Sequence, residues 1–337
     1  MVSTTEARTR PVATKKSRRR RRVRRLSRRD KVVVALLLGI PLLLDLAFVW
    51  LPAFASVFLS FTKWTGVGGV HLKACTTNAS LPGIPQPGCL NGVQNYRQAF
   101  NSTVTPDFWP AVQHNLIWLA VFIVIATPLG MLFAVIIDRG IRGSRIYQSV
   151  LFLPVMLSLA MIGIVWQLIY SSNYGLINTV IGHNHNSNLI DWLGNPRLNL
   201  WAILVEATWR QAGYVMVLYL AGLKAVDPAL KEAAVIDGAN SWQTFWRVVF
   251  PVLRPINVVI LVVTVIESLR AFDLVYITGK GNPVKGLEIL SVLVTQNIVG
   301  ETQRIGFGST LGVVLLVISL VPISIFLYQT FRREEKQ

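Results

Sequence analysis

Charged side chains are scarce in this sequence. Only 15% of its 337 residues are Asp, Glu, Lys or Arg, whereas 53% are hydrophobic. Soluble domains usually carry about 25% charged residues, and a soluble protein of this composition would run short of polar groups to cover its surface. The scarcity excludes an ordinary soluble domain and favours a chain that buries its apolar surface in a bilayer.

Acidic residues are scarcer still, because 16 Asp and Glu stand against 33 Lys and Arg, for a net charge of +17. A charge of this size can indicate a nucleic-acid binder, but 14 of the basic residues lie in residues 1–31. We expect this segment to be a disordered cytoplasmic tail and expect no nucleic-acid partner. The tail either contacts anionic headgroups of membrane lipid or serves only as a topology signal.

Patterns for catalysis and metal binding are also missing. His183 and His185 form an H-x-H pair, which is too few ligands for a metal site. Gly281–Gly286 is followed by Leu287 and Glu288, whereas the ATP-binding Walker A motif needs Lys and then Ser or Thr after its last glycine. We therefore expect no catalytic residue, no metal and no cofactor on this chain.

Long apolar runs are what the sequence does have. Each of six runs is long enough to cross a ~30 Å hydrocarbon layer as a helix: 32–60, 115–137, 147–170, 200–223, 255–277 and 309–331. A further apolar run, Leu287–Val299, is too short to cross and is expected to form an outer amphipathic helix. The expected fold class is an all-α membrane protein with about six transmembrane helices.

The distribution of Lys and Arg sets the orientation of these spans. With the basic tail inside, 24 of the 33 basic residues lie on the inner side, as the positive-inside rule requires. This places the N-terminus and the short tail 332–337 in the cytoplasm. The segment 61–114 then forms an outer loop.

The two cysteines, Cys75 and Cys89, both lie in this outer loop. A disulfide persists outside the cytoplasm, and closing a loop of about 15 residues stabilises it by ~3 kcal/mol in the chain-entropy model. The bridge is the favoured interpretation, and two unpaired thiols are the alternative.

A pair of short helices is predicted between the fourth and fifth spans. Asp227 can cap a helix over 228–236, and Gly238 can end it in a left-handed conformation. Ser241 is expected to cap the second helix and Pro251 to terminate it. The product is a helical hairpin at the inner membrane surface.

The side chains of this hairpin suit a protein contact. Ala233, Ala234 and Ala239 are small enough for another backbone to approach, Glu232 adds a charge, and Phe245 adds an apolar anchor. A helix that docks in a groove of a partner has these properties. An interfacial amphipathic linker with no partner would have them too.

The same residues resemble the EAA loop of ABC importer permeases, here within 224–255. The matching positions are Glu232, Ala233, Ala234, Asp237, Gly238, Ala239, Phe245 and Pro251. Other stretches resemble the maltose-type, carbohydrate-importing branch, among them Gly92–Tyr96, Gly175–Asn178, Trp192–Gly194, Phe272–Asp273 and Gly306–Gly308. The similarity covers about 32–331, although Gly279–Pro283 departs from the usual Gly-Gly-Pro and Phe250 replaces the usual Leu.

The resemblance implies a type I ABC importer permease-like bundle in the inner or plasma membrane of a bacterium, with a permease domain over 115–331 and cytoplasmic EAA coupling helices. It implies a second permease subunit that completes the pore as a heterodimer. It also implies two copies of a cytoplasmic ATPase, which carry the ATP and Mg, and an extracytoplasmic solute-binding protein. The implied solute is a sugar or oligosaccharide, with another polar solute such as glycerol phosphate as the alternative.

Ionisable residues in the fourth and fifth spans are candidate solute contacts, because charges in lipid usually face a cavity or each other. They are Glu206, Arg210, Glu267, Arg270 and Asp273. Helical spacing could instead pair Glu206 with Arg210, and Glu267 with Arg270, in a structural role. Candidate pore residues for a neutral solute are Trp209, Gln211, Tyr214 and Asn297, for which core packing is the alternative.

Two other classes of protein are alternatives. An ion-coupled secondary transporter would need inverted repeats and spans broken at the midplane, and the first half of the sequence has no second copy. A membrane-embedded enzyme would need polar catalytic groups at matched depths. Neither class explains the EAA-like hairpin.

Overall fold

Helices make up every regular element of the part of the chain that the structure describes, with one isolated β-bridge between Thr62 and Leu90. The structure is a computed structural model that describes residues 27–70, 75, 88–182, 189–279, 284–300 and 303–334. The all-α prediction is confirmed for these residues. Most of the predicted basic tail, and the pair His183 and His185, lie outside them. The chain divides into two units, Met1–Ala53 and Phe54–Gln337.

The first span is one unbroken helical run. It consists of α1 (Arg28–Asp45), η1 (Leu46–Trp50) and α2 (Leu51–Leu59), and η1 is a single π-helical turn. The apolar part, Lys31–Leu59, has 29 residues, and at 1.5 Å per residue it is about 44 Å long. This matches the span predicted for 32–60.

The second span is also continuous but starts earlier than predicted. A short helix, α3 (Gln94–Phe100), precedes it. The span itself consists of α4 (Phe108–Val121), η2 (Phe122–Ala126) and α5 (Thr127–Asp138), which follow one another without a break. Residues 61–114, expected as an outer loop, therefore contain a short helix and the first turns of the second span.

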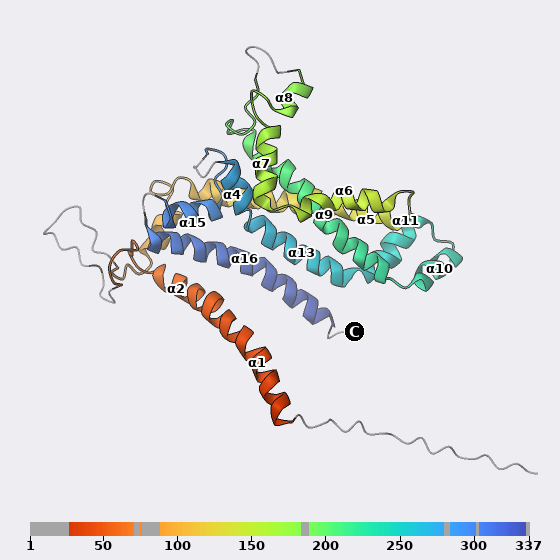
Figure 1. Ribbon diagram of the computed structural model, residues 1–337, viewed down its shortest axis with the longest axis horizontal. Coiled ribbons are helices and arrows are strands. Elements are labelled where there is room, and N and C mark those ends of the chain that lie inside the picture. The colour runs from red at the N-terminus through yellow and green to blue at the C-terminus, as the bar shows by residue number, and fades with distance from the viewer. Residues whose placement is uncertain are drawn as a thin grey trace, which may run out of the picture. The chain divides into compact units, whose positions relative to one another are not determined.

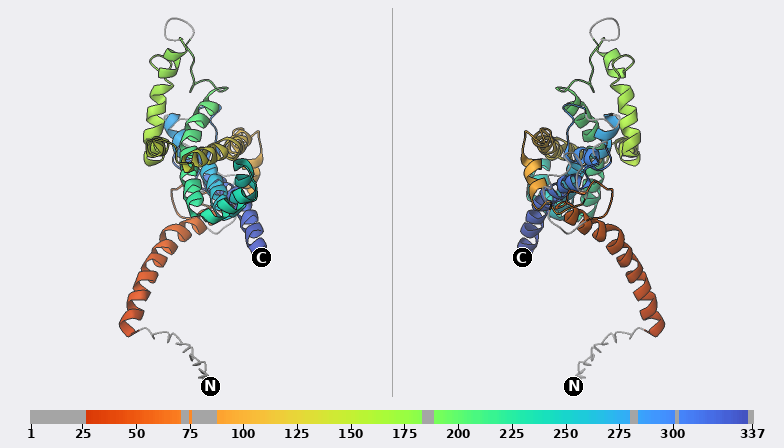
Figure 2. Two further views of the ribbon diagram at one scale, coloured as in Figure 1. Left: turned by 90° about the vertical axis from the view of Figure 1, so that its right-hand side faces the viewer. Right: turned by 90° about the vertical axis from the view of Figure 1, so that its left-hand side faces the viewer.

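The predicted span 147–170 is helical but sharply bent. The structure has two helices, α6 (Ser144–Met156) and α7 (Leu159–Ile169), bent by 102° relative to each other. Leu157 and Ser158 between them are extended, and the Ser158 hydroxyl accepts a hydrogen bond from the Met161 amide at 3.2 Å. The serine therefore caps a new helix. Figures 1 and 2 show α7 leaving α6, with α8 (Leu176–Val180) beyond it.

The fourth span, predicted at 200–223, is the long helix α9 (Asn199–Ala225), and α10 (Pro228–Ile236) leaves it at 73°. Helix α9 packs against α5 and α6, which run beside it in Figure 1. A Cβ on Gly130 of α5 would come within 2.8 Å of Val215 of α9. Small residues permit this kind of close approach between membrane helices, so α5 and α9 form a tightly packed pair.

The fifth span is interrupted. After α11 (Ser241–Thr244), η3 (Phe245–Val249) and α12 (Phe250–Val252), the chain turns by 74° into α13 (Arg254–Leu269). Helix α13 ends at Leu269, and α14 (Phe272–Thr278) follows. The predicted span 255–277 thus covers two helices with a break at 270–271.

The last two helices pack against each other. Helix α15 (Leu290–Ile298) lies within Leu287–Val299, where a helix was expected. It packs against α4 and α16, with Leu290 and Leu293 buried. Helix α16 (Ile305–Glu334) covers the predicted sixth span, 309–331. By length and composition the described part of the chain holds three continuous candidate spans, or up to six if each bent pair counts as one.

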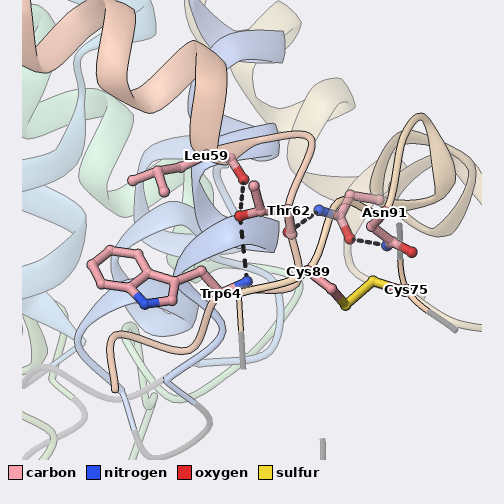
Figure 3. Close-up of a disulfide and its surroundings, with 7 residues drawn as sticks. Leu59, Thr62, Trp64, Cys75, Cys89 and Asn91 are labelled. Atoms are coloured by element: carbon pink, nitrogen blue, oxygen red, sulfur yellow. Dashed lines mark hydrogen bonds between the residues drawn. A yellow bond between two sulfur atoms is a disulfide. The ribbon is translucent and has the colours of Figure 1, made fainter. Parts of the chain in front are cut away.

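The expected disulfide between Cys75 and Cys89 is present, with a Cα–Cα distance of 5.0 Å (Figure 3). The Cys75 amide donates to the Leu90 carbonyl at 3.1 Å, and Leu90 forms the β-bridge to Thr62. The Asn95 amide group donates to the Thr62 carbonyl at 2.8 Å. The disulfide therefore extends a hydrogen-bonded network that fixes the chain after α2 to α3.

Candidate functional site

The predicted hairpin forms at one end of the second unit, where α10 and α11 lie at the right of Figure 1. Its start follows the prediction. The Asp227 carboxylate accepts a hydrogen bond from the Ala229 amide at 2.9 Å, and Pro228 occupies the first helical position. Proline suits this position because the amide it lacks would have no helical partner there.

The turn of the hairpin is set by Gly238. Its φ is +80°, the left-handed conformation that was expected. The Gly238 amide donates to the Val235 carbonyl at 3.0 Å, and the Ala239 amide donates to the Ala234 carbonyl at 2.9 Å. These two bonds form a Schellman motif, which satisfies the last carbonyls of α10. The direction of the chain after α10 therefore depends on one glycine.

One prediction about the second arm of the hairpin is wrong. The cap of α11 is Asn240 and not Ser241, because Asn240 and Gln243 exchange side-chain and backbone hydrogen bonds of 2.8 and 3.0 Å in a capping box. The helical run Ser241–Val252 ends one residue after Pro251, close to the predicted end, and the chain turns at the buried Leu253. Proline interrupts helices because it removes a backbone donor.

The hairpin exposes a mixed apolar and acidic surface. Val235 is 65% exposed, Ile236 is 86% exposed and Trp242 is 70% exposed, and Glu232 is also exposed. Among the nine residues of α10, Ala234 is buried. Large apolar side chains gathered at a polar helix end indicate a contact surface, so the geometry permits docking of a partner against α10 and the turn.

The residues of the EAA-like motif divide between this surface and the interior. Exposed positions are Glu232, Ala233, Asp237 and Gly238, Ala234 is buried, and Ala239, Phe245 and Pro251 are intermediate. Trp246 packs its ring against those of Trp242 and Phe250, at centroid distances of 5.5 and 4.9 Å. These aromatic contacts support the second arm of the hairpin.

Asp138, which is not among the predicted site residues, ties the hairpin to the bundle. Its carboxylate oxygens lie 2.9 Å from Lys224 Nζ and 3.2 Å from Lys231 Nζ. Asp138 and Lys231 are 93 positions apart, so no local pattern connects them. The one available signal was an acidic residue at a helix C-terminus, where the helix dipole disfavours negative charge.

A second group of predicted residues meets at a cavity of about 20 Å³, room for about one water. Arg210, Glu267, Arg270 and Asp273 all line it, together with residues such as Trp118 and Leu274. Arg210 Nη1 lies 3.2 Å from a Glu267 carboxylate oxygen, which links α9 to α13. Four of the five predicted ionisable residues are therefore brought together.

The predicted pairing within each helix is wrong. Arg210 bonds to Glu267 of α13 and not to Glu206, one turn away on its own helix. Glu267 forms its ion pair with Arg210, and among the described residues no ion pair joins it to Arg270, the residue that caps α13. Glu206 is fully buried, and its carboxylate oxygens accept no hydrogen bond from the residues that the structure describes.

The four candidate pore residues for a neutral solute lie outside this cavity. Gln211 is buried and donates to the Thr264 hydroxyl at 3.4 Å, which joins α9 to α13. Trp209 lines an apolar groove of about 390 Å³ beside α5 and α6. Tyr214 is half-buried, and Asn297 donates to a carbonyl of its own helix at 2.8 Å.

Within the described ranges no three His, Cys, Asp or Glu side chains gather as a metal site would require. The ion pairs at the candidate sites instead run between helices, from Arg210 to Glu267 and from Asp138 to Lys224 and Lys231. This arrangement serves to join helices and line a polar cavity.

Sequence and structure comparisons agree with this architecture. Residues 126–336 match the family described as the inner membrane component of binding-protein-dependent transport systems. The xylose/arabinose import permease XacH of Haloferax volcanii is 31% identical over 82% of this chain and 86% of its own length. The permease GgtC of Synechocystis, which takes up osmoprotective compounds, is 32% identical over 73% of this chain and 87% of its own length.

A similar fold occurs in a bacterial ABC transporter that imports the acidic polysaccharide alginate. The TM-score is 0.70 at 20% identity, over 90% of this chain and 96% of that chain. The match to the family covers more than half of the sequence, including the hairpin and both groups of candidate residues. The chain therefore belongs to the family of binding-protein-dependent inner membrane components, the permease subunits of ABC importers.

Proposed function

We propose that this chain forms one half of the pore of a sugar or oligosaccharide importer and that its hairpin docks a separate ATPase. A second permease subunit completes the pore as a heterodimer. Two copies of the ATPase bind the ATP and Mg, and an extracytoplasmic binding protein delivers the solute. The observation that carries the docking proposal is the exposed apolar surface of α10 and its turn.

Docking at this hairpin is supported by its geometry. Ala233 and Gly238 leave the backbone accessible on the exposed side of the turn, and Val235 and Ile236 present apolar side chains beside them. Residues of this kind seat a helix in a groove of a partner. The exposed Glu232 adds a charge that a basic partner residue can meet.

The orientation follows from the same proposal. An ATPase that uses cellular ATP must bind on the cytoplasmic side, so the hairpin end of the bundle faces the cytoplasm, with both chain termini on that side. The disulfide between Cys75 and Cys89 then lies on the outer side, where disulfides persist. The excess of Lys and Arg on the inner segments supports this orientation.

The solute class rests on the relatives. XacH is named for pentoses, and the transporter of similar fold imports a polysaccharide. GgtC is named for osmoprotective compounds, which keeps a different polar solute, such as glycerol phosphate, as the alternative. We further infer that the cavity at Arg210 and Glu267 belongs to the solute path, because its charged walls suit a polar solute.

Co-purification tests the docking proposal. The tagged chain is purified with its cognate ATPase in mild detergent, and Glu232→Lys is compared with Asp191→Lys, an exposed acidic residue far along the chain from the hairpin. We expect the ATPase to be lost from the first variant and retained by the second. Equal retention in both variants, at equal permease yield, would refute docking at α10.

A ligand panel tests the solute class. The cognate binding protein is screened by thermal shift against pentoses, hexoses, oligosaccharides, polyols and glycerol phosphate, and each hit is tested for ATP-dependent uptake into proteoliposomes that hold the whole transporter. Uptake of a sugar or oligosaccharide supports the proposal. Uptake of glycerol phosphate alone would refute the carbohydrate assignment and leave the docking proposal standing.

A further inference from the structure

Three helices meet at one carboxylate beside the hairpin. Asp138 is the last residue of α5. It forms ion pairs with Lys224, in the last turn of α9, and with Lys231, in the middle of α10. The Asp138 side chain is 17% exposed, whereas those of Lys224 and Lys231 are 65% and 36% exposed. The carboxylate is thus the shielded centre of the group, where salt screens a charge less.

The placement of Asp138 is electrostatically unfavourable on its own. A carboxylate at a helix C-terminus meets the negative end of the helix dipole. Two ammonium groups from other helices reverse this effect, since each lies within 3.2 Å of a carboxylate oxygen. The favourable charge interactions of Asp138 therefore lie between helices and not within α5.

Apolar packing does little to hold α10 itself. Ala234 is buried in this helix, and a groove of about 230 Å³ lies beside it, lined by Asp138, Lys231, Val235, Thr244 and others. The Thr244 hydroxyl in the groove is buried and has no hydrogen-bond partner among the described residues. Because this space is not filled by side chains, the ion pair between Asp138 and Lys231 is a direct link across it.

Helix α10 is joined to the chain at both ends. It continues from α9 through two residues, Val226 and Asp227, at a bend of 73°, and it leads into α11 through the turn at Gly238. The ion pair from Lys231 to Asp138 adds an attachment to α5 in the middle of α10. Through this attachment a push on α10 acts on α5 directly and does not merely change the bend.

We propose that Asp138 is the positioning residue that passes movement of the hairpin to the α5–α9 pair. The proposal rests on the proposed function, in which an ATPase moves α10. It assigns Asp138 no contact with the ATPase or the solute. The link to Lys231 carries the movement, whereas the link to Lys224 holds Asp138 within the α5–α9 pair.

The test uses the whole transporter, reconstituted with its ATPase and binding protein, and measures solute uptake per ATP hydrolysed. Asp138→Asn keeps the shape of the side chain and removes both ion pairs. We expect the ATPase to co-purify as it does with the unaltered chain. The solute uptake per ATP hydrolysed should fall roughly fivefold, which corresponds to a coupling free energy of about 1 kcal/mol. Lys231→Gln should lower the ratio similarly, and Lys224→Gln should lower it less.

Two further variants separate positioning from general damage. Asp138→Glu keeps the charge and should restore most of the ratio. Arg142→Gln removes an exposed charge from the loop that follows α5, and it should leave the ratio unchanged. If the Asp138→Asn chain fails to insert in the membrane, Lys231→Gln provides the same test. It removes the ion pair to Asp138 by changing the more exposed of the two partners.

The outcomes distinguish this inference from the proposed function. An unchanged ratio in Asp138→Asn and Lys231→Gln, with the ATPase still bound, would overturn the role of Asp138 and leave docking intact. Loss of the ATPase from both variants would also overturn it, since Asp138 would then be needed to shape the docking surface. If the unaltered chain binds no ATPase, the proposed function itself fails.

Discussion

Replacing Gly238 by valine is the most direct perturbation of the hairpin turn. The φ of +80° at this residue is left-handed, and the two hydrogen bonds that close α10 are made by the amides of Gly238 and Ala239. A Cβ placed on Gly238 would meet no heavy atom within 4 Å. The substitution therefore adds backbone strain to the turn without a steric clash.

The size of the effect follows from this strain. A left-handed conformation costs an L-residue with a Cβ about 1–2 kcal/mol, and at 1.4 kcal/mol per tenfold the correctly turned hairpin becomes roughly 5- to 30-fold less populated relative to open forms. Affinity for a partner falls in proportion to the population that can bind. Asparagine visits the left-handed region more readily, so Gly238→Asn is the matched control.

The assay is a titration of the cognate ATPase onto the purified chain in nanodiscs, followed by ATP-dependent uptake in proteoliposomes. We expect Gly238→Val to lower the affinity for the ATPase by up to roughly 5- to 30-fold. Gly238→Asn should lower this affinity several-fold less. If valine and asparagine give the same affinity, and both match glycine, the left-handed turn does not govern docking and the reasoning is refuted.

Three further perturbations test the packing of the bundle. Gly130→Ala should lower the stability in detergent by ~1–3 kcal/mol, because its Cβ would crowd α9, whereas Gly312→Ala, which meets nothing within 4 Å, should leave the unfolding midpoint unchanged. Glu206→Gln should raise the midpoint of unfolding, since a buried carboxylate without hydrogen-bond partners costs ~1–3 kcal/mol or more. A lower midpoint of unfolding would contradict this reasoning. Replacing Cys75 and Cys89 by serine should lower the stability of the outer segment by ~3 kcal/mol, seen as faster proteolysis there, and an unchanged rate would contradict this.

Local chemistry explains which parts of the hairpin could be predicted. A cap by Asp227 and a turn at Gly238 depend on the few residues on either side, and both are present in the structure. The cap at Asn240 also has a local signal, because Gln243 three residues later completes a capping box. Residue type alone does not separate Asn240 from the neighbouring Ser241, since both are good caps.

Contacts between distant segments could not be read from the sequence. The spacing of Glu206 and Arg210 allows a pair on one helix face, but the structure pairs Arg210 with Glu267, which is 57 positions away. Which pairing forms depends on how α9 packs against α13, and local spacing does not contain this information. For the same reason, the ion pair between Asp138 and Lys231 could not be predicted from local spacing.

Hydropathy likewise predicts where apolar runs lie but not whether the helix within them is continuous. The run at 147–170 is predominantly apolar, yet Ser158 starts a new helix at 102° to the one before it. A hydroxyl side chain in an apolar run can either bond to its own helix or cap the next one. Pro154 removes one backbone donor close to the break, which weakens the end of α6.

The break between α13 and α14 links the fold to the proposed solute path. Arg270 and Ala271 lie outside both helices, and inside a bilayer non-helical backbone is tolerated only against protein or a water-filled cavity. Both residues line the cavity that also holds Arg210 and Glu267. The interruption and the charges thus meet at the same place, and a polar cavity within the membrane accounts for both. A lipid-facing position would leave the charges and the broken backbone without partners.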